Sequence, residues 1–208
     1  MFVANLFENP VKNVIVVMPG GFHPFHQGHK YLYDKAHEAF PDADIYVAAT
    51  GDTSERPFPI EAKKALAAIA GVPPQYFVQV KSPFQAREIT QHYDPDHTAL
   101  IFVRSEKDRG TPPEAGTVKK DGSPSYLQNY TDNLKPMSQH GYMAYLPTVQ
   151  FRAGDEDVSS ASEIRALWPK ADGYPRQQVA KNLYPENPAK AVKILNGVLG
   201  EAAGTGAI

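Results

Sequence analysis

The feature that most constrains this chain is an unbroken apolar run over residues 14–18 (VIVVM) that ends at Pro19-Gly20-Gly21. Such a run is typical of a strand buried on both faces, as in a parallel sheet. Apolar and aromatic residues then recur at helical spacing over 28–40, and Pro41 ends that segment. A buried strand, a glycine turn and a helix in this order predict the first unit of an α/β fold.

Strands and helices are expected to alternate beyond this unit. The predicted order is a strand at 45–49, a helix at 61–70, a strand at 76–80, a helix at 84–92 and a strand at 100–103. This alternation predicts a Rossmann-like, doubly wound parallel sheet. Ligands bind such sheets at the carboxyl ends of strands, so the chemistry is expected after Met18, Ala49 and Val103.

The alternation lapses after the fourth strand. Residues 104–141 are rich in Gly, Pro, Asn, Asp and Lys with scattered tyrosines. This long insertion far exceeds the usual connection of about 2 to 6 residues in α/β folds. We expect either a functional segment that covers a substrate, or a disordered or partner-facing loop.

The remaining chain predicts a strand at 142–146, a helix at 160–168 stopped by Pro169, and a helix at 188–199 capped by Asn187. These elements divide the chain into two expected parts. They are a Rossmann-like domain over 1–168, and a small C-terminal helical segment over 169–208 that ends in a mobile Gly/Ala tail.

The amino-acid composition excludes some classes of function and gives no support to others. The 208 residues include 21 basic and 23 acidic side chains, so a net charge of -2 gives no reason to expect nucleic acid or an anionic membrane as a partner. The absence of cysteine excludes disulfides, thiolate zinc sites and a cysteine nucleophile. The run at 14–18 is too short for a signal sequence or a membrane span, so we expect a cytoplasmic protein. The sequence leaves open whether the protein forms a homo-oligomer.

The strongest candidate site is GGFHPFHQGH, residues 20–29, between the first strand and the first helix. Its glycines allow backbone N–H groups to approach a phosphate chain, and a helix N-terminus favours anions. His26 and His29 are three positions apart, so both project toward one point if the helix begins near Gln27. Two imidazoles there would donate hydrogen bonds to a phosphate on which negative charge develops.

Two other interpretations of these histidines compete with a phosphate clamp. His23, His26 and His29 could form a metal site, although the sequence offers no supporting carboxylate and Pro24 disturbs helical alignment. His26 and His29 could also cap the helix for purely structural reasons, which the preceding buried strand and Gly-Gly turn disfavour.

The pattern Gly20-x-Phe22-x-Pro24-x-His26-x-Gly28-His29 resembles the signature of HIGH-type nucleotidyltransferases. GGFHPFHQGH is most similar to the GRFQPFHxGH form of archaeal-type nicotinamide mononucleotide adenylyltransferases. The resemblance implies a Rossmann-like fold and transfer of the adenylyl group of ATP to nicotinamide mononucleotide, which yields NAD and pyrophosphate. It implies catalytic roles for His26 and His29. The residues that it assigns to nucleotide binding are Gly20, Gly21, Phe22, His23 and Gly28.

Residues 159–165, SSASEIR, resemble a second motif of this family, ISxTxIR. The resemblance implies that Ser160, Ala161 and Ser162 bind the nucleotide and that Arg165 grips the triphosphate. Ser160 and Glu163 also have the spacing of a capping box that begins a helix. The two interpretations are compatible.

Residues 56–63, RPFPIEAK, resemble a third and weaker motif, NPFTxxER. Lys63 keeps the charge of the motif's arginine but loses its planar fork, and Gly21 lacks the arginine of GRFQ. Lys63 and Lys64 could instead lie on a solvated helix face. The weaker candidates for contact with the acceptor are Thr50, Arg56, Phe58, Lys63 and Arg104.

The resemblance implies an in-line attack of the acceptor's phosphate on the α-phosphorus of ATP, with no covalent enzyme intermediate. Substrate-bound Mg²⁺ would bridge the phosphates through substrate oxygens and water, so no protein metal ligand is expected. The fold alone does not determine the activity, so three alternatives remain. They are a cytidylyltransferase, an adenylyltransferase with another phosphorylated acceptor, and a nucleotide-binding protein without turnover.

Overall fold

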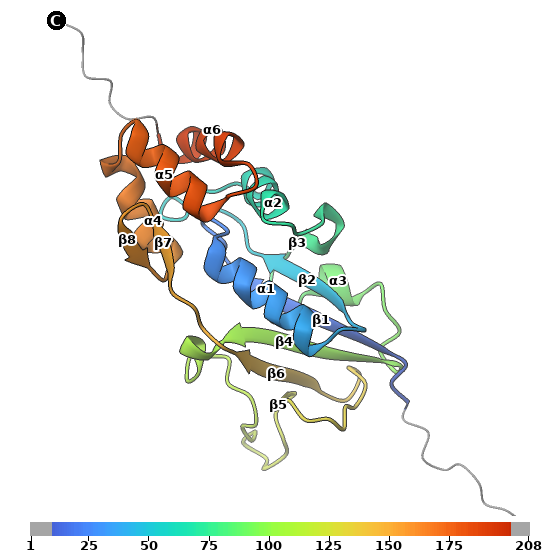
Figure 1. The fold of residues 1–208 in the computed structure, drawn as a ribbon. Coiled ribbons are helices and arrows are strands. Elements are labelled where there is room, and N and C mark those ends of the chain that lie inside the picture. The colour runs from blue at the N-terminus through green and yellow to red at the C-terminus, as the bar shows by residue number, and fades with distance from the viewer. Residues whose placement is uncertain (1–9, 201–208) are drawn as a thin grey trace, which may run out of the picture.

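The computed structural model describes residues 10–200, and a six-stranded sheet in the order β3-β2-β1-β4-β6-β5 forms its centre (Figure 1). Every neighbouring pair in this sheet is parallel. Its strands are β1 (Asn13–Gly20), β2 (Asp44–Ala49), β3 (Phe77–Gln79), β4 (Thr98–Ser105), β5 (Leu127–Asn129) and β6 (Gly141–Leu146). The predicted α/β fold with a Rossmann-like parallel sheet is confirmed.

Helices cover both faces of the sheet. The helices within residues 10–200 are α1 (Gln27–Ala39), α2 (Ile60–Ile69), α3 (Arg87–Thr90), α4 (Ala161–Leu167), α5 (Tyr174–Leu183) and α6 (Pro188–Leu199). None of them is long and apolar enough to cross a membrane. The predicted helix at 84–92 is shorter than expected, because Ala86 has a left-handed backbone (φ 44°) that a helix cannot include.

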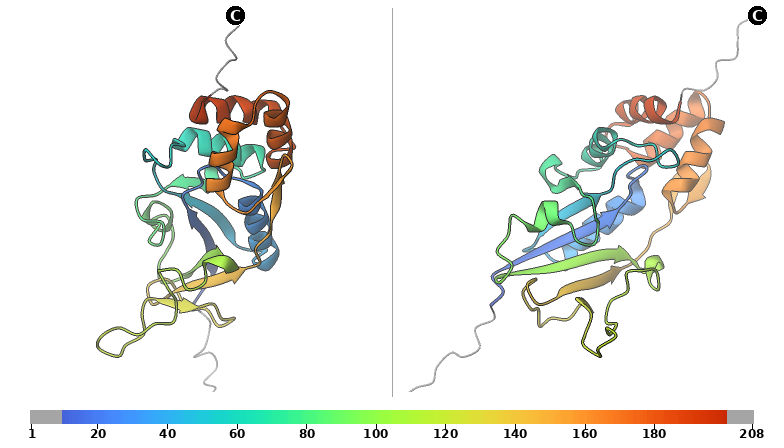
Figure 2. Two further views of the ribbon diagram at one scale, coloured as in Figure 1. Left: turned by 90° about the vertical axis from the view of Figure 1, so that its left-hand side faces the viewer. Right: turned by 180° about the vertical axis from the view of Figure 1, so that it is seen from behind.

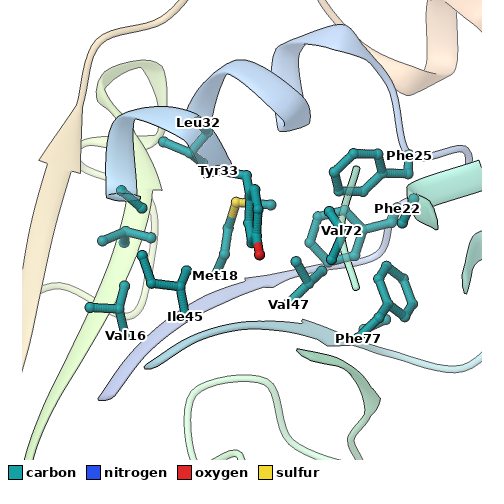
Figure 3. Close-up of a cluster of buried hydrophobic side chains, with 14 of the residues drawn as sticks. Val16, Met18, Phe22, Phe25, Leu32, Tyr33, Ile45, Val47, Val72 and Phe77 are labelled. Atoms are coloured by element: carbon teal, nitrogen blue, oxygen red, sulfur yellow. The ribbon is translucent and has the colours of Figure 1, made fainter. Parts of the chain in front are cut away.

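Alternate residues of β1 face opposite cores. Val16 and Met18 pack beneath α1, together with Tyr33 (Figure 3), whereas Ile15 and Val17 belong to the core on the face that α3 covers. Because both sets are fully or almost fully buried, β1 is enclosed on both sides, as its unbroken apolar run predicts.

The C-terminal helices gather beside α2 at one end of the molecule (Figures 1 and 2). The helix at 188–199 and its cap agree with prediction, and Asn187 Oδ1 accepts a hydrogen bond from Lys190 N at 3.2 Å. Two features of this region were not predicted, namely α5 and an antiparallel hairpin of β7 (Phe151–Ala153) and β8 (Glu156–Val158). The predicted mobile tail over 201–208 lies outside the described residues.

The insertion after β4 contributes to the sheet. It begins with a short 3₁₀ turn at Glu106–Asp108 and contains an isolated bridge between Val118 and Pro124. It then supplies β5, which pairs with β6 as an edge strand and was not predicted.

Candidate functional site

A cavity of about 400 Å³ lies at the carboxyl ends of β1 and β4 and is called here the strand-end cavity. Strand order reverses between these neighbours, since β2 lies on one side of β1 and β4 on the other. Such a reversal is where doubly wound sheets bind ligands. The predicted site residues that line the cavity are Gly20, Gly21, Phe22, His26, Gly28, His29, Arg56 and Arg104.

His26 and His29 cap α1 through a reciprocal pair of hydrogen bonds. Nδ1 of His26 accepts from Gly28 N at 3.0 Å, and Nδ1 of His29 accepts from His26 N at 3.2 Å. The two rings stack with their centroids 3.7 Å apart. Because Nδ1 is an acceptor in both rings, the hydrogen of each neutral imidazole is on Nε2. His26 and His29 therefore do cap the helix, as one of the alternative interpretations proposed. Capping uses only the Nδ1 atoms, so both Nε2–H groups remain available as donors.

Burial keeps both rings neutral at pH 7. It lowers the pKa of His29 from 6.5 to about 3, with a further contribution from the charge of Lys107. Burial also lowers the pKa of His26 well below its ordinary value, assisted by His29 and Lys107. The pair thus presents uncharged hydrogen-bond donors to the cavity.

The glycine between the histidines is required by close packing. A Cβ on Gly28 would lie 2.9 Å from Cε1 of His26 and 3.1 Å from Cε1 of Phe151. Phe151 stacks on His26 with the ring centroids 4.7 Å apart. Phe151 was not predicted as a site residue, since it belongs to the short strand β7 and no local pattern links it to the loop.

Segments near the other end of the chain hold residues 20–29, which we call the histidine loop. Gln27 Nε2 donates to the carbonyl of Leu183 at 2.6 Å, and the buried Tyr184 hydroxyl donates to the carbonyl of Phe25. The end of α5 therefore fixes the entry into α1.

The second predicted motif contacts the histidine loop through Arg165. Its Nη1 atom donates to the backbone carbonyl of His23 at 2.5 Å. Ser160 caps α4 as predicted, because its Oγ accepts from Glu163 N at 3.4 Å while Glu163 Oε2 accepts from Ser160 N at 3.0 Å. Ser160 Oγ also lies 3.0 Å from Ser162 Oγ.

The residues of the second motif adjoin the strand-end cavity without lining it. Ser159 lines it, whereas Ser160, Ala161, Ser162 and Arg165 do not. A ligand that reaches them must therefore extend beyond the cavity.

Three of the weaker candidates, Thr50, Phe58 and Lys63, do not line the cavity. Lys63 is fully buried, and its Nζ donates to the carbonyl of Thr50 at 2.6 Å. Burial lowers the pKa of Lys63 to about 8, and this lowering is opposed by Asp52 and assisted by Arg56. The solvated helix face considered for Lys63 is thus wrong. Phe58 is a core residue, and its backbone N donates to Nδ1 of His23 at 3.2 Å.

Cations dominate the rim of the cavity. Arg56, Arg104 and Lys107 line it, and the one lining carboxylate among residues 10–200 is that of Asp108. Lys107 was not among the candidates, although it closely follows β4, where strand ends are expected to carry chemistry. Its Nζ donates to the carbonyl of Ser159 at 2.8 Å, and this bond ties the insertion to the second motif.

The three histidines of the loop do not converge on one ion. Nδ1 of each ring is occupied by a backbone N–H, from Phe58, Gly28 and His26 respectively. No group of three or more His, Asp or Glu side chains in residues 10–200 is arranged to hold a metal. The geometry gives no support to a three-histidine site.

Comparison with known proteins adds no family to this description. No protein-family model matches the chain, and no curated protein matches it.

Proposed function

We propose that this protein is a nucleotidyltransferase that transfers the adenylyl group of ATP to nicotinamide mononucleotide, giving NAD and pyrophosphate. The observation that carries the proposal is the pair of stacked histidines at the start of α1. Both Nδ1 atoms accept backbone hydrogen bonds, so both neutral rings offer Nε2–H to a cation-lined cavity at the sheet's switch point. This arrangement suits a phosphate chain better than a neutral ligand.

In the proposed reaction, an oxygen of the acceptor's phosphate attacks the α-phosphorus of ATP. The bond from the α-phosphorus to the bridging oxygen breaks, and pyrophosphate leaves with the electron pair. Charge grows on the α- and β-phosphate oxygens, where His26 and His29 would donate from Nε2. Donors held in place before the reaction stabilise this charge without reorganisation, and each is worth about 3 to 4 kcal/mol.

The other residues position the triphosphate. Arg165 is held against the histidine loop by its bond to His23, and together with Ser160 and Ser162 it would hold the β/γ end. An arginine suits this task because its planar fork can contact two oxygens at once. Positioning of this kind supplies much of the catalysis in phosphoryl transfer.

Mg²⁺ would enter as part of the nucleotide substrate and neutralise charge on its phosphates. Phosphate oxygens and water would supply most of its ligands, which fits a cavity lined by one carboxylate, Asp108.

Pyrophosphate release tests the proposal. We would incubate the protein with each of the four ribonucleoside triphosphates and a panel of phosphorylated acceptors, with Mg²⁺ present. Release with ATP and nicotinamide mononucleotide, matched mole for mole by NAD, supports it. Release with a different pair would replace the substrate assignment. Tight binding of α,β-methylene ATP without release from any pair would instead identify a nucleotide-binding protein without turnover.

A further inference from the structure

Asp108 differs in charge from the other ionised residues that line the strand-end cavity. It is the one acidic residue among the lining residues of the range 10–200, and it ends the 3₁₀ turn that follows β4. The residue is half-buried. Its carboxylate forms no ion pair and accepts no hydrogen bond within the described part of the chain. A ligand group that approaches Asp108 therefore has no protein partner to displace there.

The two cations next to Asp108 in the sequence have other partners. Nζ of Lys107 donates to the carbonyl of Ser159 at 2.8 Å. Nε and Nη2 of Arg109 donate to the two carboxylate oxygens of Glu106, at 2.6 and 3.0 Å. Neither cation therefore neutralises Asp108 by direct contact.

A third nearby cation, Arg104 at the end of β4, is also held elsewhere. Its Nη1 donates to the carbonyl of Thr111 at 2.8 Å, and its guanidinium carbon lies 5.2 Å from the centroid of the Phe84 ring. Since Arg104 forms no ion pair with Asp108 either, the negative charge of Asp108 remains to attract a positively charged group of a ligand.

The proposed acceptor has a positively charged group. The ring nitrogen of nicotinamide mononucleotide bears the ribose, so its pyridinium ring is permanently cationic, whereas its phosphate is an anion. The other ionised residues of the range 10–200 that line the cavity are the cations Arg56, Arg104 and Lys107. A pyridinium ring in this cavity is therefore attracted by one lining side chain, that of Asp108.

We propose that Asp108 is a specificity-determining residue that attracts the pyridinium ring of the acceptor. This role rests on the proposed function for the identity of the acceptor. Attraction between opposite charges favours a cationic ring over an uncharged ring of nearly the same shape. A ring that bears its own carboxylate, as in nicotinate mononucleotide, is disfavoured by repulsion from Asp108.

Two acceptors that differ in ring charge test this role without turnover. Reduced nicotinamide mononucleotide has an uncharged dihydropyridine ring and keeps the ribose, the phosphate and the carboxamide. We would titrate each form by calorimetry at low ionic strength, into the protein alone and into the protein with α,β-methylene ATP and Mg²⁺. The wild-type protein should bind the oxidised form roughly 5- to 20-fold more tightly than the reduced form. Added salt should lessen this preference.

Variants assign the preference to one residue. Asp108→Asn should weaken binding of the oxidised form, leave binding of the reduced form unchanged, and narrow the difference between nicotinamide and nicotinate mononucleotides. Glu114→Gln is the matched control, because Glu114 is an exposed carboxylate of the same insertion that does not line the cavity. Thermal melting checks that both variants fold, and the comparison of the two forms in the wild-type protein needs no variant.

The role of Asp108 and the proposed function can fail separately. Equal affinity of the wild-type protein for the two forms, or a preference that Asp108→Asn retains, would overturn the role even if the protein makes NAD. Equal weakening of both forms in Asp108→Asn, seen only with Mg²⁺, would also overturn it by assigning Asp108 to the metal.

Two further outcomes concern the function. If the protein binds neither form, the role of Asp108 is overturned, and pyrophosphate release with another acceptor would show whether the protein is still a nucleotidyltransferase. An Asp108-dependent preference for the oxidised form, in a protein that releases no pyrophosphate, would support the role and overturn the function.

Discussion

Nη1 of Arg165 lies 2.5 Å from the backbone carbonyl oxygen of His23, although the two residues are 142 positions apart in the sequence. The bond joins α4 to the histidine loop, so the two motifs that the sequence singles out meet in space. It also engages Nη1 in positioning, and no other side-chain hydrogen bond of Arg165 is formed within residues 10–200. We expect the rest of the guanidinium to contact a ligand.

Replacing Arg165 by lysine tests whether this side chain both holds the histidine loop and binds ATP. In Arg165→Lys the ammonium could keep one donor to the His23 carbonyl but would lose the planar fork, so we expect nearly unchanged thermal stability and a KM for ATP raised roughly tenfold. Steady-state kinetics and thermal melting measure the two effects. An unchanged KM and kcat would remove Arg165 from the site.

Variants of His29 separate its two roles. Asparagine keeps a hydrogen-bond acceptor close to the position of Nδ1 and removes the donor at Nε2. We therefore expect His29→Asn to keep the cap on α1 and its stability while kcat falls about 10²- to 10³-fold. Pyrophosphate release and thermal melting measure the two effects.

Glutamine and alanine complete the series at this position. His29→Gln reaches the position of Nε2 with an amide donor, so it should retain more turnover than His29→Asn. His29→Ala should lose both the cap and turnover. If His29→Ala melts lower yet turns over normally, His29 serves only the helix.

The lowered pKa values of two histidines predict a loss of stability in acid. The pKa values of His29 and His23 are about 3 and about 4 in the folded protein, against 6.5 for a free imidazole. Below pH 6.5 the unfolded chain binds more protons, so the free energy of unfolding falls as the pH drops from 6.5 toward 3. Urea unfolding between pH 4 and pH 7 should show this slope, and His29→Asn should have a shallower one. Equal slopes would mean that His29 titrates normally when folded.

The insertion predicts a specific pattern of proteolysis. Lys119 and Lys120 are exposed, whereas Lys107 is tied to Ser159 and Arg109 is paired with Glu106. Trypsin should therefore cut first at Lys119 and Lys120, as mass spectrometry of the fragments would show.

Ligands test whether the insertion covers the acceptor. If it does, α,β-methylene ATP together with nicotinamide mononucleotide should slow cleavage more than either ligand alone. Equal protection by any phosphorylated compound would indicate a general anion effect. Cleavage that no ligand slows would leave the insertion as a surface segment.

Local patterns predicted the central fold because its elements have strong signals. The run at 14–18 could only be a buried strand, and Asn187 marked the start of α6 correctly. The hairpin of β7 and β8 was missed because each strand has three residues, although Gly154-Asp155 is a turn signal. β5 was missed for a similar reason, since only Leu127 in it is buried.

The candidate site, like the fold, could be predicted only where its residues are close in the sequence. The loop glycines and histidines were predicted because they are adjacent in the sequence, and most of them line the cavity. The burial of Lys63 was not predicted, because it depends on the packing of α2 beneath the loop. The stacking of Phe151 on His26 has no local signature, and neither does the burial of His23 Nε2 without a hydrogen-bond partner among residues 10–200.

The hydrogen bonds from the end of α5 to the histidine loop determine when the site can fold during synthesis. Gln27 and Phe25 emerge early from the ribosome, but their partners Leu183 and Tyr184 follow 156 and 159 positions later. A growing chain can pair β1 with β2 and β4 long before those partners exist. The histidine loop is held in place only after α5 has been synthesised. A chain truncated before Leu183 therefore contains both histidines but lacks the contacts that hold their loop in place.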